Sequence, residues 1–372
     1  MTTTDAAADA AWMKAALALA RRVLGQVWPN PAVGCVLVNN GRLVGRGWTQ
    51  KGGRPHAETE ALRRAGNAAR GATAYVTLEP CSHHGKTPPC ADALIAAGVE
   101  RVVVACRDPD PRVNGAGIAR LQAANIAVTE GVCAAAAEEL NEGFLLRIRR
   151  GLPLITLKTG ATADGRVATP SGQSQWITGP VARADVHRLR AEYDAVLVGS
   201  ATVVADDPLL TCRLPGLEQR SPVRVVLDAQ LRTPLTAKLV QTAREVPVWL
   251  FTAKSEDDPA AQALRAAGVD VHQVELDREG FGVNFRQSFA VLAERGITRV
   301  LVEAGGLLAG SLLIDGLVDR LELYRAPSLL GGDAQPMTGS LKITDLAQVR
   351  RLDRIAVRTL GPDLVESFRI QP

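Results

Sequence analysis

The stretch Ala74-Tyr75-Val76-Thr77-Leu78-Glu79-Pro80-Cys81 runs from an apolar segment directly into a cysteine. Residues 74–78 are short and rich in β-forming side chains, which predicts a buried strand. On both sides of this stretch, short apolar runs alternate with helix-like segments. Strands that alternate with helices predict an α/β sandwich whose sheet is covered on both faces.

The first half of the chain contains several further elements of this kind. Strands are expected at residues 32–38, 43–48, 101–105 and 126–128, with a hairpin turn at Asn39-Asn40-Gly41-Arg42. Helices are expected over residues 56–65, 90–98 and 117–124. The apolar stretch 12–20 follows Asp5 and Asp9 and ends in two arginines, so an amphipathic helix fits it better than a signal peptide.

The second half restarts the pattern after a basic stretch at residues 144–153, which we expect to be a linker. Core strands are expected at residues 154–157, 195–198, 223–227, 248–251 and 300–302, and helices at 181–192 and 289–295. A length of 372 residues suits two domains, each with its own core. We therefore expect α/β domains over residues 1–148 and 153–372.

The composition excludes several classes of protein. With 43 basic and 39 acidic side chains, the chain has a net charge of +4. This charge is too small to indicate extended binding to nucleic acids or membranes, but it suits small anionic ligands. Six cysteines are too sparse for a disulfide scaffold, which favours a cytoplasmic setting. No run approaches the roughly twenty apolar residues that would span a bilayer.

The strongest chemical signal is His56-Ala57-Glu58, followed by Cys81 and Cys90. One imidazole and two thiolates predict a zinc site with the fourth position open for water, the catalytic arrangement. Zinc lowers the pKa of bound water to about 7 and so generates hydroxide at neutral pH. Glu58, at a helix start two residues beyond a ligand, is the candidate proton shuttle.

This pattern is similar to the signature of zinc-dependent nucleobase deaminases, except that eight residues separate the cysteines instead of two. The insert is cationic and rich in Gly and Pro, so it is expected to meet an anionic group such as a phosphate. A structural zinc with His83 or His84 as fourth ligand is the alternative, against which Glu58 argues. Buried thiols without a metal are a second alternative, and we assign that role to Cys35, Cys106, Cys133 and Cys212.

Four segments resemble the family of bifunctional riboflavin-biosynthesis deaminase/reductases: residues 29–35, 56–58, 77–90 and 108–111. The resemblance runs from about Val23 to the C-terminus, and the long insert between the cysteines is usual in that family. It implies a cytidine-deaminase-like α/β/α domain followed by a dihydrofolate-reductase-like α/β domain. It also implies pyrimidine contact by Asn30 and ribose-phosphate contact by His83 and Lys86. The alternatives are a turn role for Asn30 and a solvated loop for the other two.

The second half lacks the G-x-G-x-x-G fingerprint of dinucleotide-binding folds. Instead, the strand at residues 300–302 is followed by Gly305-Gly306 and a predicted helix. Glycines let a backbone approach a ligand closely, and a helix N-terminus offers free N–H groups to a pyrophosphate. Taken alone, this motif is also common as plain turn chemistry.

Residues 158–166, 174–178 and 199–208 resemble the reductase domain of the same family, which uses NADPH. The cofactor contacts that the resemblance implies are Gly160, Ala161, Trp176, Thr202, Asp206, Gly305, Gly306, Leu307, Leu308, Ala309, Gly310 and Ser311. The substrate contacts that it implies are Lys158, Ser174, Arg190, Leu210, Arg213 and Glu303.

The residue types suit these roles. Arg190 and Arg213 can clamp a phosphate, Asp206 can bind ribose hydroxyls, and Trp176 offers a flat apolar wall. Glu303 follows a strand, where doubly wound sheets place their ligands. The alternatives are a solvated helix face for Arg190 and a core position for Trp176. Lys254 is a weaker candidate for contact with the 2′-phosphate of NADPH.

The resemblance therefore implies two steps on one phosphoribosylated pyrimidine: zinc-dependent hydrolytic deamination, then NADPH-dependent reduction of the ribosyl chain. One rival is a nucleic-acid base deaminase with an RNA-binding C-terminal domain. Three Tyr and six Phe are too few for its stacking surface. A second rival is a nucleotide-binding regulator with a structural zinc, which would leave Glu58 and the Gly-Gly segment without a role. The sequence leaves open whether the chain forms a homo-oligomer.

Overall fold

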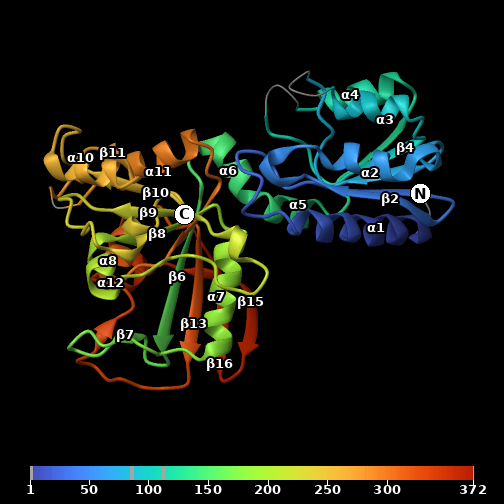
Figure 1. Cartoon of the computed structure of the whole chain (residues 1–372). Coiled ribbons are helices and arrows are strands. Elements are labelled where there is room, and N and C mark those ends of the chain that lie inside the picture. Colours follow the sequence, from blue (N-terminus) through green and yellow to red (C-terminus); the bar gives the residue numbers. More distant parts are fainter. Residues whose placement is uncertain (1–2, 84–87, 111–113, 281, 372) are drawn as a thin grey trace. The chain divides into compact units, whose positions relative to one another are not determined.

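The computed structural model describes residues 3–83, 88–110, 114–280 and 282–371. It divides the chain into two compact units, Met1–Gly151 and Leu152–Pro372 (Figure 1). Each unit is an α/β structure with its own main sheet, as the alternating pattern predicts. Within the described residues, no helix is long and apolar enough to cross a membrane.

The N-terminal unit has a five-stranded sheet of order β2-β1-β3-β4-β5. Its strands are β1 (Gly34–Asn39), β2 (Arg42–Trp48), β3 (Thr73–Val76), β4 (Arg101–Val104) and β5 (Ala127–Glu130). Strand β1 is antiparallel to β2 and β3, whereas β3, β4 and β5 are parallel. The helices are α1 (Thr3–Arg21), α2 (Ala57–Ala65), α3 (Cys90–Ala96), α4 (Ala116–Ala123), α5 (Ala134–Leu140) and α6 (Glu142–Arg150).

Glycines allow helices to pack closely on both faces of this sheet. A Cβ atom on Gly34 of β1 would overlap the carbonyl oxygen of Ala16 in α1, and one on Gly47 of β2 would overlap that of Ala57 in α2. Gly47 pairs with Cys35, the neighbour of Gly34, so the two glycines face opposite sides of the sheet. Helices α1 and α2 therefore cover opposite faces (Figure 1).

The C-terminal unit has a nine-stranded sheet of order β11-β10-β9-β8-β12-β6-β13-β16-β15. Its strands are β6 (Leu154–Thr162), β8 (Ala195–Gly199), β9 (Val223–Leu227), β10 (Val248–Thr252), β11 (Asp270–Gln273), β12 (Arg299–Val302), β13 (Arg320–Ala326), β15 (Leu352–Leu360) and β16 (Asp363–Ile370). The seven strands from β11 to β13 are parallel, and β16 and β15 continue the sheet antiparallel. A separate pair joins β7 (Arg166–Ala168) to β14 (Gln335–Pro336).

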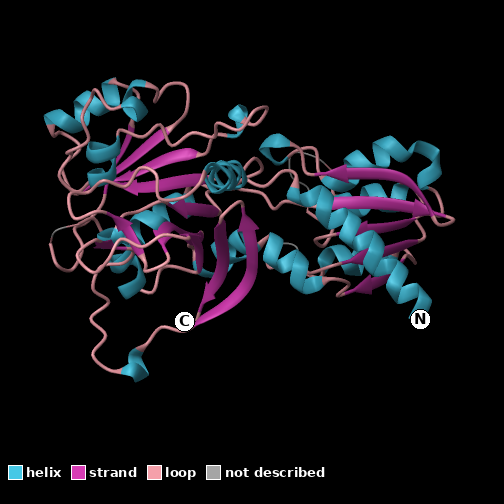
Figure 2. Cartoon of the chain, turned by 90° about the horizontal axis from the view of Figure 1, so that it is seen from below, coloured by secondary structure: helices cyan, strands magenta, loops and turns pink. Residues whose placement is uncertain are grey.

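Helices connect the parallel strands of this unit, as short apolar runs separated by helical segments require. They are α7 (Pro180–Glu192), α8 (Ser200–Asp206), α9 (Lys238–Gln241), α10 (Pro259–Ala266), α11 (Phe285–Glu294) and α12 (Gly306–Ile314). Strands β8, β9 and β10 are buried almost throughout, and the side chains between them and the helices form the core. Figure 2 shows the strands of the two sheets in magenta with helices packed around them.

The expected linker at residues 144–153 is wrong, because most of it is helix α6 (Glu142–Arg150). Phe144 and Leu145 are buried in the core of the N-terminal unit, so this stretch belongs to a folded element. The helix ends at Gly151, whose φ of 68° is a left-handed cap. The division between the two units falls after this glycine.

Candidate active sites

The three predicted metal ligands lie together in the N-terminal unit. His56 precedes the first turn of α2, Cys81 follows β3, and Cys90 opens α3. Their ligand atoms all lie within 4.8 Å of one another. His56 Nδ1 is 3.3 Å from Cys90 Sγ and 3.6 Å from Cys81 Sγ. Segments far apart in the sequence therefore place one nitrogen and two sulfurs around a common point.

This donor set fits zinc, which prefers imidazole nitrogen and thiolate sulfur at short range. Hydrogen bonding from Cys90, together with that from His56, outweighs burial and lowers the pKa of the Cys81 thiol to about 4. The thiolate is the form that binds a metal. Within the described residues, the cluster contains no fourth His, Cys, Asp or Glu. His84, one of the two alternative fourth ligands, lies outside the described residues.

Glu58 lies in the first turn of α2 and is only 3% exposed. Burial raises its pKa to about 7, against the opposing charge of His56. It lies within hydrogen-bonding reach of the Cys90 thiol, although it is not one of the three ligands. A buried carboxyl beside a metal site can take up and release a proton near neutral pH.

The other residues expected to contact the deaminase substrate differ in their surroundings. The Asn30 side-chain amide donates to the carbonyl of Val27 at 3.2 Å, a local turn contact, and Gly53 leaves room for this side chain. The Nδ1 atom of His83 is buried and has no hydrogen-bond partner in the structure. Lys86 lies outside the described residues.

Glu79 lies two residues before Cys81, and the sequence alone indicates no role for it. Its buried carboxylate accepts backbone N–H bonds from Gly115 at 2.9 Å, Gly117 at 3.0 Å, Ile118 at 3.3 Å and Asp108 at 3.4 Å. These hydrogen bonds hold the start of α4 against the segment that carries Cys81. A glutamate that follows a strand gives no local signal of such distant partners.

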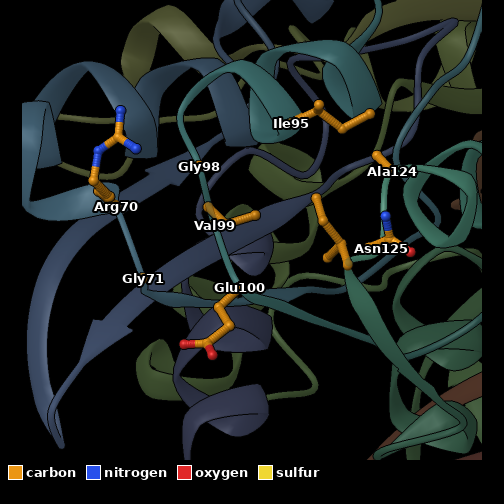
Figure 3. A pocket seen from close by; sticks show the side chains of 9 residues that line it. Arg70, Gly71, Ile95, Gly98, Val99, Glu100, Ala124 and Asn125 are labelled. Carbon is orange, nitrogen blue, oxygen red and sulfur yellow. The ribbon is translucent and has the colours of Figure 1, made fainter.

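The described surface of this unit also has a hollow of about 430 Å³ (Figure 3). It lies where β3, β4 and β5 begin, and its lining consists of Arg70, Gly71, Ile95, Gly98, Val99, Glu100, Ala124, Asn125 and Ile126. Cys81 and Cys90, in contrast, follow the carboxyl end of β3. The hollow is therefore not part of the metal centre.

In the C-terminal unit, three predicted substrate residues form one partly buried charged cluster. Glu303 directly follows β12, where the register of β12 with β6 places it beside Lys158. The guanidinium of Arg190, from α7, donates to both carboxylate oxygens of Glu303 at 2.7 and 2.9 Å. The sequence suggested that Arg190 was free to clamp a phosphate, but most of its donors face protein groups.

The charges of this cluster depend on one another. Burial alone would raise the pKa of Glu303, but Arg190 and Lys158 outweigh it and hold that pKa at about 2. Burial lowers the pKa of Lys158, and the charge of Glu303 partly offsets this. The Lys158 ammonium lies 5.5 Å from the ring centre of Tyr324 and close to Gly160. The cluster thus holds a cation and an anion side by side at the end of a parallel strand.

The helix predicted after the strand at residues 300–302 is α12, which begins at Gly306 with Gly305 as its N-cap. A Cβ atom on Gly305 would meet no atom within 4 Å, so the backbone is open to a ligand there. A Cβ on Gly306 would come within 2.5 Å of the Pro336 carbonyl oxygen, and one on Gly310 within 3.1 Å of Gly339 N. These two glycines are needed for helix packing.

The remaining predicted cofactor residues are spread over several elements. Gly160 and the buried Ala161 lie on β6, whereas Thr202 and the exposed Asp206 lie on α8. Leu308 lies 3.4 Å from the Cβ position of Gly199, so the start of α12 packs beside the start of α8. Leu307 is 85% exposed and Ala309 is buried. Ser311 donates its hydroxyl to the carbonyl of Leu307.

Trp176 is 67% exposed, so a core position for it is wrong. The guanidinium of Arg183 lies 4.5 Å from its ring centre. Ser174 is half-buried in the same segment. An exposed indole with a guanidinium packed against it is available to stack on a flat ligand.

The structure therefore brings together a zinc-type ligand set and a buried glutamate in one unit. In the other unit, it places a charged cluster at the ends of parallel strands. Residues 6–106 match the family of the cytidine and deoxycytidylate deaminase zinc-binding region, and residues 153–365 match the family of the RibD C-terminal domain. Together these features define a bifunctional enzyme, in which a zinc-binding deaminase domain precedes a reductase domain.

Full-length relatives identify the family. The chain is 46% identical over 367 residues to riboflavin biosynthesis protein RibD of Escherichia coli K12, covering 96% of this chain and 98% of that protein. It is 43% identical over 354 residues to the protein of that name from Bacillus amyloliquefaciens, covering 95% and 94% of the two chains. The chain belongs to the family of riboflavin biosynthesis protein RibD.

Two solved structures agree with this assignment over the whole chain. Acinetobacter baumannii RibD superposes with a TM-score of 0.88 at 40% identity, covering 99% of this chain and all of that chain. A deaminase/reductase from Thermotoga maritima superposes with a TM-score of 0.86 at 33% identity and the same coverage. The α/β fold and the combination of deaminase and reductase activities in riboflavin biosynthesis are thus confirmed.

Proposed function

We propose that this enzyme acts twice on one phosphoribosylated pyrimidine. Residues 1–148 would deaminate 2,5-diamino-6-(5-phosphoribosylamino)pyrimidin-4(3H)-one, and residues 153–372 would reduce the product to 5-amino-6-(5-phosphoribitylamino)uracil. The Thermotoga maritima relative is described as a diaminohydroxyphosphoribosylaminopyrimidine deaminase and a 5-amino-6-(5-phosphoribosylamino)uracil reductase. The observation that carries the proposal is the close approach of His56, Cys81 and Cys90 beside a buried Glu58.

In the deaminase step, His56, Cys81 and Cys90 hold zinc. When bound, zinc supplies a Lewis acid that lowers the pKa of a water to about 7. Glu58 would accept a proton from the attacking water, deliver it to the ring nitrogen next to the carbon under attack, and then assist the departure of ammonia. Burial of Glu58 supports this role, because it favours the protonated form that the second half of the step needs.

The residues around this centre would bind the substrate. Asn30, in the turn before β1, would contact the pyrimidine, and His83 and Lys86 would contact the ribose phosphate. The buried, unpartnered Nδ1 atom of His83 supports its part of this assignment, because a ligand oxygen would satisfy it.

In the reductase step, Lys158 and Glu303 would position the opened sugar chain, with Ser174, Arg190, Leu210 and Arg213 as further substrate contacts. NADPH, when bound, supplies the two electrons and one hydrogen that reduce the former anomeric carbon. The proximity of Lys158 to the Arg190–Glu303 pair supports a polar, preorganised site. A protonated Lys158 can hydrogen-bond to a sugar oxygen, whereas Glu303 can accept from a hydroxyl.

The start of α12 would hold the cofactor pyrophosphate. Gly305 is open to close approach, and no side chain caps the helix N-terminus, so backbone N–H groups remain for an anion. Gly160, Ala161, Trp176, Thr202, Asp206 and residues 306–311 would complete this site. A nicotinamide cofactor follows from the reductase family. NADPH in preference to NADH is our proposal, with Lys254 as a candidate for the 2′-phosphate.

The experiment that tests this function uses the zinc-loaded full chain and the phosphoribosyl-diaminopyrimidinone. Without NADPH, we expect ammonia release and accumulation of the deaminated pyrimidine. With NADPH, we expect oxidation of one NADPH for each ammonia, and a higher KM with NADH. Ammonia release without any NADPH oxidation would contradict the assignment of residues 153–372. We further propose a cytoplasmic setting, which the sparse cysteines favour.

A further inference from the structure

The segment Leu209–Arg213 joins α8 to the part of the chain before β9, and it carries two of the proposed substrate residues. Leu210 is buried with a φ of 56°, a left-handed conformation that side chains other than glycine rarely adopt. Such a conformation persists only where surrounding contacts hold it. The position of the neighbouring Arg213 therefore depends on whatever fixes this segment.

Helix α7 supplies most of those contacts through one histidine. His187 Nδ1 lies 3.2 Å from the carbonyl oxygen of Thr211 and 3.3 Å from the backbone nitrogen of Arg213. The thiol of Cys212 donates to the backbone carbonyl of His187 at 3.3 Å. Arg190, one helical turn further on, also donates to the Thr211 carbonyl at 3.1 Å. His187 thus contacts three consecutive residues of the segment.

The opposite side of the segment is fixed as well. Arg224 of β9 is fully buried, and its guanidinium donates to the carbonyl of Leu209 at 3.2 Å. The backbone nitrogen of Cys212 donates to the hydroxyl of Ser221 at 3.1 Å. The segment is therefore clamped between β9 and α7, and His187 closes the α7 side.

The surroundings of His187 keep its imidazole neutral. Burial is the largest cause, and the positive charges of Arg190 and Arg213 add to it, so the pKa falls to about 4. Glu303 and the Thr211 carbonyl raise the pKa of His187, but their effect is smaller than that of burial and the two arginines. A neutral imidazole can donate from Nδ1 to Thr211 in one tautomer and accept from the Arg213 N–H in the other. Both forms hold the same segment.

We propose that His187 is a positioning residue of the reductase site, which fixes residues 211–213 so that Arg213 meets the substrate phosphate. This inference rests on the proposed function, which makes Arg213 a substrate contact. His187 does not touch the reacting carbon in this account. Its loss should therefore weaken substrate binding and leave the chemical step nearly intact.

The chemistry of the Nδ1 contacts suggests a set of three variants. In His187→Asn, the side-chain amide places a donor or an acceptor near the position of Nδ1. In His187→Gln, the amide lies near the position of Nε2, and His187→Ala removes both. His272 supplies the matched control, because it is another half-buried histidine of this unit and stacks on Phe251 at 5.1 Å.

We expect His187→Ala and His187→Gln to raise the reductase KM for the deaminated intermediate about ten-fold, the effect of losing one or two hydrogen bonds. The reductase kcat should change less than about two-fold, because the phosphate contact of Arg213 that His187 positions would be the same in the ground state and the transition state. His187→Asn should recover most of the KM, and His272→Ala should leave it unchanged. Ammonia release by the same chains serves as an internal measure of enzyme concentration, and the retained reductase kcat shows that the C-terminal unit is folded.

Arg213→Ala separates the two ways in which this account can fail. If Arg213→Ala raises KM but His187→Ala does not, His187 does not position the segment and the proposed function stands. If neither variant changes KM, the phosphate does not bind at this segment. The positioning role of His187 and the proposed substrate contact of Arg213 are then both wrong. Equal KM values for the Asn and Gln variants would also overturn the inference. They would show that substrate binding does not depend on a polar atom at the position of Nδ1.

Discussion

Cys90 is the residue on which the metal centre depends most directly. It opens α3, places Sγ 3.3 Å from the imidazole of His56, and donates its backbone N–H to Cys81 Sγ at 3.3 Å. It is buried, so solvent does not compete for its sulfur. In the proposed metal centre, the side chain of Cys90 would supply one ligand, while its backbone N–H orients the sulfur of Cys81.

Cys90→Ser should weaken zinc binding at least about 100-fold, because a hydroxyl replaces one of three protein ligands. The backbone N–H bond to Cys81 would remain, so the fold should be retained. The measurement is zinc content after dialysis against a graded chelator. Cys106→Ser is the matched control, since that thiol is buried in the same unit but lies outside the ligand cluster. Equal zinc retention by the two variants would contradict the ligand assignment.

At the scale of elements, α12 combines a packing function and a proposed binding function in adjacent glycines. Gly306 lies against the Pro336 carbonyl, whereas Gly305 faces open space with an ordinary φ of −71°. The two glycines should therefore respond differently to the same added methyl group.

Gly306→Ala should lower the free energy of unfolding by about 1–3 kcal/mol, the usual effect of overpacking. Gly305→Ala should lower it by less than about 1 kcal/mol, because the added Cβ is accommodated at the helix cap. Only Gly305→Ala should raise the KM for NADPH without a matching loss of stability. Denaturant unfolding and steady-state kinetics on both variants test this, and an unchanged KM for Gly305→Ala would count against a pyrophosphate site there.

Helix α7 is held to the sheet by Asp185. Its carboxylate accepts from the Tyr324 hydroxyl of β13 at 2.7 Å and from the Arg358 guanidinium of β15 at 2.9 Å. Burial opposes ionisation, but hydrogen bonds from Arg358, Arg188 and Tyr324 outweigh it and hold the pKa of Asp185 well below its ordinary value of 3.8. Because its pKa is lowered in the fold, this carboxylate stabilises the folded chain at pH values above about 3.8, the ordinary pKa of an aspartate.

Asp185→Asn should lower the free energy of unfolding by about 2–3 kcal/mol at pH 7, because Arg358 loses its anion and Arg188 keeps only Glu192. The difference from the wild type should shrink as the pH falls below about 4, where the unfolded carboxyl becomes protonated and the native advantage is lost. Unfolding titrations at several pH values test this. Asp353→Asn on β15, where the side chain is exposed, should have little effect at any pH.

Much of the fold could be predicted because it depends on local patterns. Apolar runs at residues 195–198 and 223–227 became buried parallel strands, and the alternation with helices gave two α/β units. Helix α11 begins four residues before the predicted residue 289, because Asn284 caps it by accepting from the Gln287 N–H. The clustering of His56, Cys81 and Cys90 could be predicted because zinc chemistry restricts both residue type and order.

The rest depends on contacts between distant residues, which a single sequence does not reveal. The Arg190–Glu303 pair joins residues 113 positions apart, so the sequence could not show that this guanidinium faces a carboxylate. Gly306 and Gly310 read as a cofactor motif, but the close approach of residues 336–339 also accounts for them. The roles of Glu79 and His187 likewise follow from backbone groups that only the folded chain brings near.

At the scale of the whole molecule, two different chemistries occupy separate units of one chain. The metal ligands and Glu58 all lie within Met1–Gly151, and the Lys158–Arg190–Glu303 cluster lies within Leu152–Pro372. The proposed product of the first unit is the substrate of the second. A single substitution in the first unit should therefore stop both reactions when only the first substrate is supplied.

The most direct test follows ammonia and NADPH in one reaction with wild type and Glu58→Gln, a variant that keeps the size of the side chain. We expect the variant to lose ammonia release at least about 100-fold, the usual contribution of a general acid–base group. It should also fail to oxidise NADPH with the diaminopyrimidinone, yet match the wild type when the deaminated intermediate is supplied. Normal ammonia release by Glu58→Gln, or failure to use the intermediate despite normal zinc content, would contradict two sequential sites with Glu58 as the proton carrier of the first.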